Sequence, residues 1–241
     1  LITERPFRTP HHTASGVALV GGGKFPRPGE ISLAHRGVLF LDEFSEFPRQ
    51  VLENLRQPLE DGIITVSRAQ GTVTFPARFT LVASQNPCPC GYATDPDRRC
   101  TCSPMQIANY QKRVSGPILD RIDLHVEVPR VKFEKLSKDD LAESSKEIRA
   151  RVEKARAKQQ ARLKGTGLQS NSEMRGKDLK EFCKLTEPSI DLLRQAVTQM
   201  HLSARGYHRI LKLSRTIADL AECEEIKTEH VAEALQYRAK E

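Results

Sequence analysis

The sequence predicts an α/β domain followed by a small bundle of helices. Two apolar runs, GVLFLD at residues 37–42 and FTLVAS at residues 79–84, end in polar side chains. This pattern is typical of strands buried on both faces of a parallel sheet. Over residues 177–241 apolar side chains instead recur at helical spacing behind Thr186, Ser203 and Thr228. That spacing predicts three helices, each opened by a hydroxyl cap.

Other predicted elements complete the α/β domain, which spans residues 1–129. Between the two strands, the segment at residues 48–60 has apolar side chains on one side, which predicts a helix. We expect this helix to end early at Pro58 or to be terminated by Gly62. Two short β-prone runs around a polar turn predict a hairpin. A later segment alternates between apolar and polar side chains, which predicts a third, less covered strand. These elements are the helix at 48–60, the hairpin strands at 63–67 and 72–75, and the strand at 123–128.

Residues 130–176 are predicted to be a basic helical connector. Ser137 and Asp140 have the spacing of a capping box that opens a helix over residues 138–163. Residues 130–177 hold 14 basic and 7 acidic side chains, an excess that equals the net charge of +7 of the whole chain. The block either attracts a polyanion or forms a solvated helix face.

The composition excludes several classes of protein. The apolar runs are far shorter than the ~20 residues that cross a bilayer. The N-terminal residues lack the charged and apolar regions of a secretory signal. We therefore expect a cytoplasmic protein without a membrane partner. The chain starts at Leu1 rather than Met, so we also expect a fragment of a longer protein.

Two adjacent carboxylates, Asp42 and Glu43, follow the first predicted strand. Ligands of parallel α/β sheets bind at the carboxyl ends of the strands. At such a place Asp42 can hold Mg²⁺, mostly through water, and Glu43 can polarise an attacking water molecule. Asn86 lies at the tip of the next strand segment, beside the same sheet edge. The alternative is a strand that ends in acids at the surface.

Four cysteines follow Asn86 in the pattern C-x-C-x9-C-x-C: Cys88, Cys90, Cys100 and Cys102. Zinc prefers four tetrahedral ligands, and thiolates are among its usual ones. We predict a structural zinc site that clasps this loop. Reduced surface thiols and disulfides are the alternatives.

Several other polar residues are candidate ligands. His11 and His12 are adjacent, and on an extended segment they would point to opposite faces, which disfavours joint metal binding. Lys24 and Arg27 in a Gly- and Pro-rich stretch, and Arg68 in the predicted hairpin turn, are candidate contacts to DNA. Few aromatic residues lie among them, so the sequence indicates contacts to phosphates rather than stacking on bases. The alternative is that Arg68 is an ordinary turn residue.

Motifs spread along the chain carry a family resemblance. They are RPFRTPHH at residues 5–12, GGG at 21–23, PGEISLAH at 28–35, the strand that ends in two acids, PAR at 76–78, NP at 86–87 and SGPILDR at 115–121. Together they resemble the magnesium-chelatase-like AAA+ ATPases of the ComM/YifB type. The resemblance covers nearly the whole chain and is weakest over residues 130–175.

The resemblance implies a partial AAA+ P-loop core followed by a C-terminal helical lid, with ATP and Mg²⁺ as ligands. Residues 13–32 resemble the helix-2 insert and residues 63–75 the pre-sensor-1 hairpin, two elements that face the central pore in related ring motors. The implied site residues are Asp42 and Glu43 of Walker B, Asn86 as sensor 1, Arg121 as arginine finger and Arg205 as sensor 2.

The function implied is an ATP-driven homo-oligomeric ring, a hexamer, that acts on DNA as a helicase or branch-migration factor in recombination of incoming DNA. A chelatase-like ATPase that remodels a partner protein and a non-catalytic interaction fragment are the alternatives. The Walker A pattern G-x-x-x-x-G-K-[ST] is absent, since Phe25 follows the GGGK at residues 21–24. We therefore expect the full-length protein to hydrolyse ATP and this chain alone to be inactive.

Overall fold

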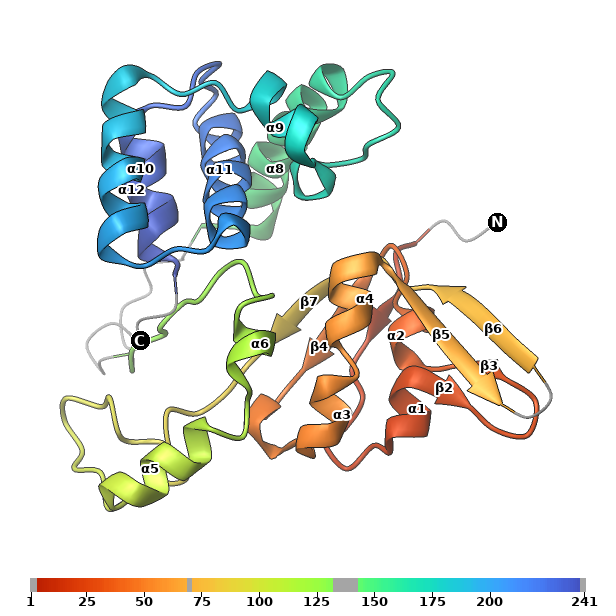
Figure 1. Cartoon of the computed structure of the whole chain (residues 1–241). Helices are drawn as coiled ribbons and strands as arrows, with labels where there is room; N and C mark the ends of the chain where they lie inside the picture. The colour runs from red at the N-terminus through yellow and green to blue at the C-terminus, as the bar shows by residue number, and fades with distance from the viewer. Residues whose placement is uncertain (1–3, 69–70, 132–142, 239–241) are drawn as a thin grey trace. The chain divides into compact units, whose positions relative to one another are not determined.

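The computed structural model describes residues 4–68, 71–131 and 143–238. The chain forms two compact units, Leu1–Ile122 and Asp123–Glu241 (Figure 1). The first unit is α/β and the second is helical, so the predicted fold class is confirmed. The division into three parts at residues 129 and 176 stays a prediction.

The first unit contains a three-stranded parallel sheet. β1 (Phe7–Arg8) pairs with β4 (Val38–Leu41), and β4 pairs with β7 (Thr80–Ala83). Leu39 in the central strand lies opposite Leu81 in β7. Because the strands are parallel, their carboxyl ends lie at one edge of the sheet. The residues that follow each strand therefore come together at that edge.

One face of the sheet carries the core of this unit. Leu39 and Leu41 have no exposed surface, and their spacing of two residues puts them on the same face of β4. Fully burying one such side chain contributes about 1.5–3 kcal/mol. Apolar side chains from several helices of this unit belong to the same core. These helices include α2 (Glu30–Leu33), α3 (Arg49–Glu53) and α4 (Arg56–Asp61).

The opposite face of the sheet is open in the part of the chain that the structure describes. Phe7 is 62% exposed and Val82 is 44% exposed. The Phe7 ring stacks on Phe40, with the ring centroids 6.3 Å apart. The prediction that both apolar runs are buried on both faces is therefore wrong: in β4 Leu39 and Leu41 are buried while Val38 and Phe40 are half-buried, and β7 is mostly exposed. β7 is an edge strand of the described sheet, so fewer neighbours cover it.

The predicted strand at residues 123–128 is also wrong, because this segment has no regular structure. Leu124, Val126 and Val128 are all exposed. A strand needs a neighbour that satisfies its backbone groups, and no strand of the described ranges pairs with this segment. The N–H of His125 instead donates to the carbonyl of Tyr237, at 2.8 Å.

The predicted helix at residues 48–60 is in fact two short helices, α3 and α4. The break lies at Asn54, and α4 continues through Pro58. Pro58 has no N–H to donate to the carbonyl of Asn54, and its ring crowds that carbonyl. In the first turn of α4 the missing N–H would be unpaired anyway. Gly62 ends α4 in the left-handed conformation, with φ 69°, as predicted.

The stretch between β1 and β4 forms a small helix, a hairpin and a second helix. The two hairpin strands pair antiparallel, with Gly21 opposite Pro28. A Cβ on Gly29 would lie 2.4 Å from the backbone nitrogen of Gly21, so only glycine fits where the chain segments meet. The elements are α1 (Gly16–Val20), β2 (Gly21–Gly22), β3 (Arg27–Pro28) and then α2.

The predicted hairpin after α4 is confirmed. β5 (Ile63–Arg68) pairs antiparallel with β6 (Gly71–Pro76). Ile64 and Val66 of β5 are buried in the core of this unit. β5 also lies next to β2 (Figure 1), so the two hairpins are neighbours. After β7 come a cysteine-rich loop and two helices, α5 (Pro104–Gln111) and α6 (Gly116–Leu119).

The second unit is a set of helices around one apolar core. α11 contacts α8, η2, α9 and α12, and it contributes Ile210 and Ile217 to the core. Of the helices described, none is long and apolar enough to cross a membrane. The elements are α8 (Ser145–Arg162), the 3₁₀ turn η2 (Asn171–Glu173), α9 (Gly176–Phe182), α10 (Glu187–Gln199), α11 (Ala204–Leu220) and α12 (Thr228–Gln236).

Capping residues determine where these helices begin. The side chain of Ser203 accepts a hydrogen bond from the N–H of Gly206, at 3.1 Å, which confirms the predicted cap of α11. α12 begins at Thr228 itself, with Lys227 as its N-cap. The cap predicted at Thr228 is thus wrong by one residue.

The basic helix α8 begins at Ser145 rather than at residue 138. Ser144 and Glu147 form a capping box, which satisfies the free N–H groups of the first turn and stops the helix from extending further back. The box predicted from Ser137 and Asp140 lies outside the described residues.

Candidate functional site

The two carboxylates predicted as Walker B lie at the carboxyl end of β4. Oδ1 of Asp42 accepts a hydrogen bond from the N–H of Glu43, at 3.0 Å, and another from the hydroxyl of Ser84. Ser84 directly follows β7, so the ends of two neighbouring strands meet at Asp42. The backbone continues this pairing, since the N–H of Phe44 donates to the carbonyl of Ser84 at 2.8 Å.

This donor set fits Mg²⁺. Asp42 and Glu43 are exposed at the sheet edge, and Mg²⁺ in phosphotransfer sites takes one or two carboxylates and keeps several waters. The bond from Ser84 uses one oxygen of Asp42 and leaves the second oxygen for an ion or its water shell. Sequence reasoning missed Ser84, although its place directly after the second apolar run was visible.

Asn86 lies two residues beyond Ser84 on the loop that leaves β7. Its side chain is exposed. The residue between them, Gln85, accepts a hydrogen bond from the hydroxyl of Ser45 at 3.0 Å. This contact ties the loop to the segment that follows the acids, so Asn86 leaves the sheet at the same edge as Asp42.

The side chain of Arg121 lies against other residues of the α/β unit to which it belongs. Its side chain is 11% exposed and pairs with Glu60, with Nη2 and Oε2 2.5 Å apart. Its Nη1 donates to the carbonyl of Pro117 at 2.6 Å. The Nε–H is buried and has no hydrogen-bond partner among the residues that the structure describes. In this conformation the guanidinium is held by α4 and α6.

Arg205 lies in the first turn of α11 and is exposed. It belongs to the helical unit, whereas the acids belong to the α/β unit. Its assignment as sensor 2 stays a prediction.

The cysteine quartet is gathered at one point of the loop after β7. The four Sγ atoms of Cys88, Cys90, Cys100 and Cys102 lie within 4.8 Å of one another, and all four thiols are free. The Sγ of Cys88 lies 3.4 Å from that of Cys90 and 3.7 Å from that of Cys100. Tetrahedral Zn–S bonds of about 2.3 Å put the sulfurs roughly 3.8 Å apart. The site therefore fits zinc, and these distances do not fit a disulfide.

Backbone groups also stabilise a thiolate in this loop. The N–H groups of Tyr92 and Thr101 lower the pKa of Cys90 to about 5. The pKa of Cys100 is raised to about 12, because burial and the neighbouring thiols outweigh the N–H of Cys102, which lowers it. The loop favours one thiolate and resists a second unless a cation balances the charge.

The candidate DNA contacts lie on the two neighbouring hairpins. Lys24 and Arg27 are exposed on the β2–β3 hairpin. Phe25 lies between them and is 67% exposed, a residue that sequence reasoning passed over. Arg68 is the last residue of β5. An exposed aromatic ring between two cations is a combination that can stack on a base while the cations contact phosphates.

The prediction that His11 and His12 point to opposite faces is wrong. Their ring centroids lie 4.1 Å apart and the ring planes are tilted by 34°, so the two rings lie next to each other. The pair lies in a turn rather than in an extended segment, and the alternation of a strand does not apply there.

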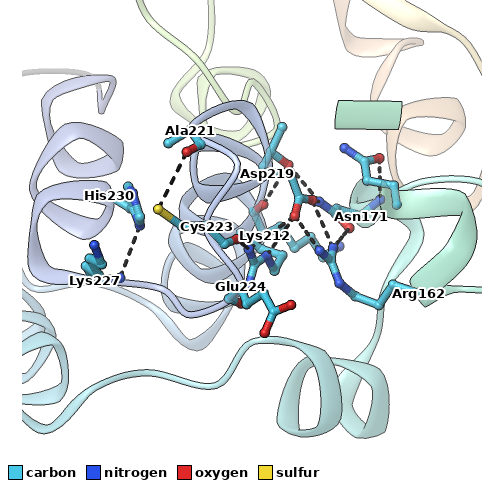
Figure 2. A network of polar contacts seen from close by, with 12 residues as sticks. Arg162, Asn171, Lys212, Asp219, Ala221, Cys223, Glu224, Lys227 and His230 are labelled. Atoms are coloured by element: carbon cyan, nitrogen blue, oxygen red, sulfur yellow. Dashed lines mark hydrogen bonds and ion pairs between the residues drawn. The ribbon is translucent and has the colours of Figure 1, made fainter. Parts of the chain in front are cut away.

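A buried polar network lies in the helical unit (Figure 2). The side chains of Asp219 and Arg215 are 0% and 2% exposed, and Nε of Arg215 donates to Oδ1 of Asp219 at 3.2 Å. Asn171 donates to the other carboxylate oxygen at 2.9 Å. Arg215 also donates to the carbonyl of Cys223 at 2.6 Å. The network joins η2, α11 and the following loop.

Two family models match the chain. The model for magnesium chelatase, subunit ChlI, matches residues 1–136, and the model for the ChlI C-terminal part matches residues 142–238. The chain belongs to the magnesium-chelatase ChlI family. Its first unit is accordingly a partial AAA+ core and its second unit is the helical lid of such proteins.

Within this ChlI family, several bacterial proteins are similar to the chain. Competence protein ComM of Haemophilus influenzae is 50% identical over 237 residues, which are 98% of this chain and 45% of ComM. The uncharacterized protein YifB of Escherichia coli is 45% identical over 98% of this chain and 46% of its own length. A Mycobacterium tuberculosis protein is 42% identical over 99% of this chain and 47% of its own length. The chain thus spans about half the length of these relatives.

Proposed function

We propose that the full-length protein is an ATP-hydrolysing AAA+ motor that acts on DNA, as a helicase or branch-migration factor in the recombination of incoming DNA. The observation that carries the proposal is the meeting of Asp42 and Glu43 with the end of β7 at one sheet edge. Membership in the ChlI family supports the ATPase. The name of the similar competence protein supports DNA as the substrate. Such work belongs to the cytoplasm, where ATP and the chromosome are found.

Each site residue then has a role in hydrolysis. Asp42 holds Mg²⁺, directly or through water, while Glu43 takes a proton from the attacking water. Asn86 orients that water from the end of the neighbouring strand. When bound, Mg²⁺ supplies charge that stabilises the phosphate oxygens in the transition state.

Two arginines complete the proposed site. Arg121 stabilises the transferring phosphoryl group of the next copy in a homo-hexameric ring. For this it must exchange its contact with Glu60 for one across the interface. Arg205 contacts the γ-phosphate from the lid. We propose that the four cysteines hold a structural zinc ion beside the loop of Asn86.

The two hairpins are the proposed grip on DNA. Lys24, Arg27 and Arg68 contact phosphates, and Phe25 stacks on a base. Phosphate contacts release counterions, so binding falls steeply with salt. The exposed Phe25 supports single-stranded DNA, because only unpaired bases offer a free face for stacking.

The decisive experiment uses the full-length protein with forked DNA. Glu43→Gln is expected to keep ATP binding and to abolish ATP hydrolysis and strand separation. Arg68→Ala is expected to weaken fork binding at moderate salt, with ATP binding unchanged. Unchanged hydrolysis in Glu43→Gln contradicts the proposal.

A chelatase-like motor that remodels a partner protein is the second candidate, and membership in the ChlI family favours it. Forked DNA would then leave the ATPase rate unchanged, and a partner protein would raise it. A third candidate is a non-catalytic interaction module. The absence of the Walker A pattern from this chain favours that reading for the chain by itself. We expect the 241-residue chain alone to show no hydrolysis in either case.

A further inference from the structure

A histidine from the neighbouring strand reaches the second acid of the proposed Walker B pair. His12 follows β1 by a few residues, and Glu43 follows β4. β1 and β4 are adjacent and parallel, so the segments after them leave the sheet at the same edge. His12 Nδ1 lies 2.9 Å from Oε2 of Glu43.

The His12 ring is held in place by its surroundings. Its side chain is 29% exposed, and its ring meets Phe47 edge-on, with the centroids 6.4 Å apart and the planes at 80°. Phe47 is buried in the core of the unit. Such an aromatic contact restricts the ring, which leaves Nδ1 directed at Glu43.

The backbone of Glu43 is fixed as well. Its φ of 52° is in the left-handed region, which non-glycine residues rarely adopt outside constrained sites. Its N–H donates to Asp42, and its carbonyl accepts from the N–H of Glu46 at 2.7 Å. The side chain is 53% exposed. Apart from the contact with His12, the described residues leave the carboxylate open to solvent.

We propose that His12 is a positioning residue for Glu43. Its Nδ1–H donates to Oε2 and fixes the carboxylate at the strand end, so that Oε1 stays available to accept the proton of the attacking water. A carboxylate held in one orientation loses less freedom when it reaches the reactive geometry. The inference rests on the proposed function, in which Glu43 is the general base.

The kinetic test uses the full-length protein. His12→Ala is expected to lower kcat for ATP about tenfold with KM changed less than twofold, because only the orientation of the base is lost. His12→Asn is expected to recover most of the loss, since its amide N–H lies about as far from Cβ as Nδ1 does. His208→Ala is the control, because His208 is exposed on α11 of the helical unit, and we expect less than a twofold change in kcat.

A spectroscopic test is independent of activity. In protein labelled with ¹⁵N-histidine and free of nucleotide, His12→Ala identifies the His12 signals among the 7 histidines. We expect these signals to show a hydrogen on Nδ1 and to shift in Glu43→Ala. Signals that do not respond to Glu43→Ala, or a kcat that stays unchanged or rises in His12→Ala, overturn the proposal. If Glu43→Gln retains full hydrolysis, the proposed function fails instead, and the two failures are thereby separated.

Discussion

Both terminal nitrogens of Arg162 donate to the carboxylate of Asp219, and Nη1 lies 2.9 Å from Oδ2. The pair links the end of α8 to α11, and the carboxylate is fully buried. A buried carboxylate that neutralises cations is costly to remove, because the partner charges stay behind.

Asp219→Ala should therefore destabilise the helical unit by about 3–5 kcal/mol. The loss leaves the buried guanidinium of Arg215 without its counter-ion. Urea unfolding followed by circular dichroism measures the change. Asp191→Ala is the control, since its pair with Arg194 is exposed on both sides and should be worth less than about 1 kcal/mol. Equal effects from the two substitutions would contradict the role of burial.

The purified protein should contain one zinc ion per chain. Cys90→Ser should abolish the zinc and lower the unfolding temperature, because three thiolates and a hydroxyl bind zinc much less tightly. Metal analysis by mass spectrometry gives the stoichiometry. Cys223→Ser is the matched control, because Cys223 lies in the helical unit, and it should keep the metal. Zinc near zero in protein prepared without chelators would remove this prediction.

Arg121→Ala in the full-length protein should lower kcat for ATP about 10³-fold or more, as expected for an arginine finger. ATP affinity should change little, because the residue acts on the transition state. Glu60→Ala is the matched control, since it breaks the same ion pair and leaves the arginine in place. If both variants lose activity to the same degree, the ion pair is structural and the finger assignment fails.

Phe25→Ala should weaken binding of single-stranded DNA about tenfold, the loss expected from one stacked base. Phe25→Trp should bind at least as well as the parent protein, because a larger ring still stacks. Fluorescence anisotropy at fixed salt measures the affinity. Equal affinities for Phe25→Ala and the parent protein would show that the ring does not touch the strand.

The α/β unit should lose stability as the pH falls below about 6.5, in part through His35. Nδ1 of His35 accepts a hydrogen bond from the N–H of Arg78 at 3.1 Å, which requires an unprotonated Nδ1. Burial and the charges of Arg36 and Arg78 lower the pKa of His35 from 6.5. The unfolded chain therefore takes up the proton first, and folding loses free energy until the pH is below the folded pKa. In urea unfolding at pH 7.5 and 5.5, His35→Gln should show the smaller loss.

The structure bears out several sequence predictions that rest on local pattern. The first acid-ended strand and the hairpin at residues 63–76 follow from periodicity and turn residues, which act over a few positions. The prediction of a strand at residues 123–128 is wrong because an alternating pattern forms a strand only where a partner strand is present. The contact of His12 with Glu43 could not be predicted from the sequence, because it joins residues 31 positions apart. Only the pairing of β1 with β4 brings these residues together.

The close approach of Gly21 and Gly29 bears on how the protein would release its substrate. This crossing anchors the hairpin at its base, so the Phe25 tip has few conformations to lose when it engages a strand. An anchored tip of this kind should lengthen the residence time of each contact more than it speeds encounter. If the full-length protein is the DNA motor proposed above, it must release the strand once per cycle, and movement of the whole hairpin, rather than loosening of its tip, is then the expected route to release.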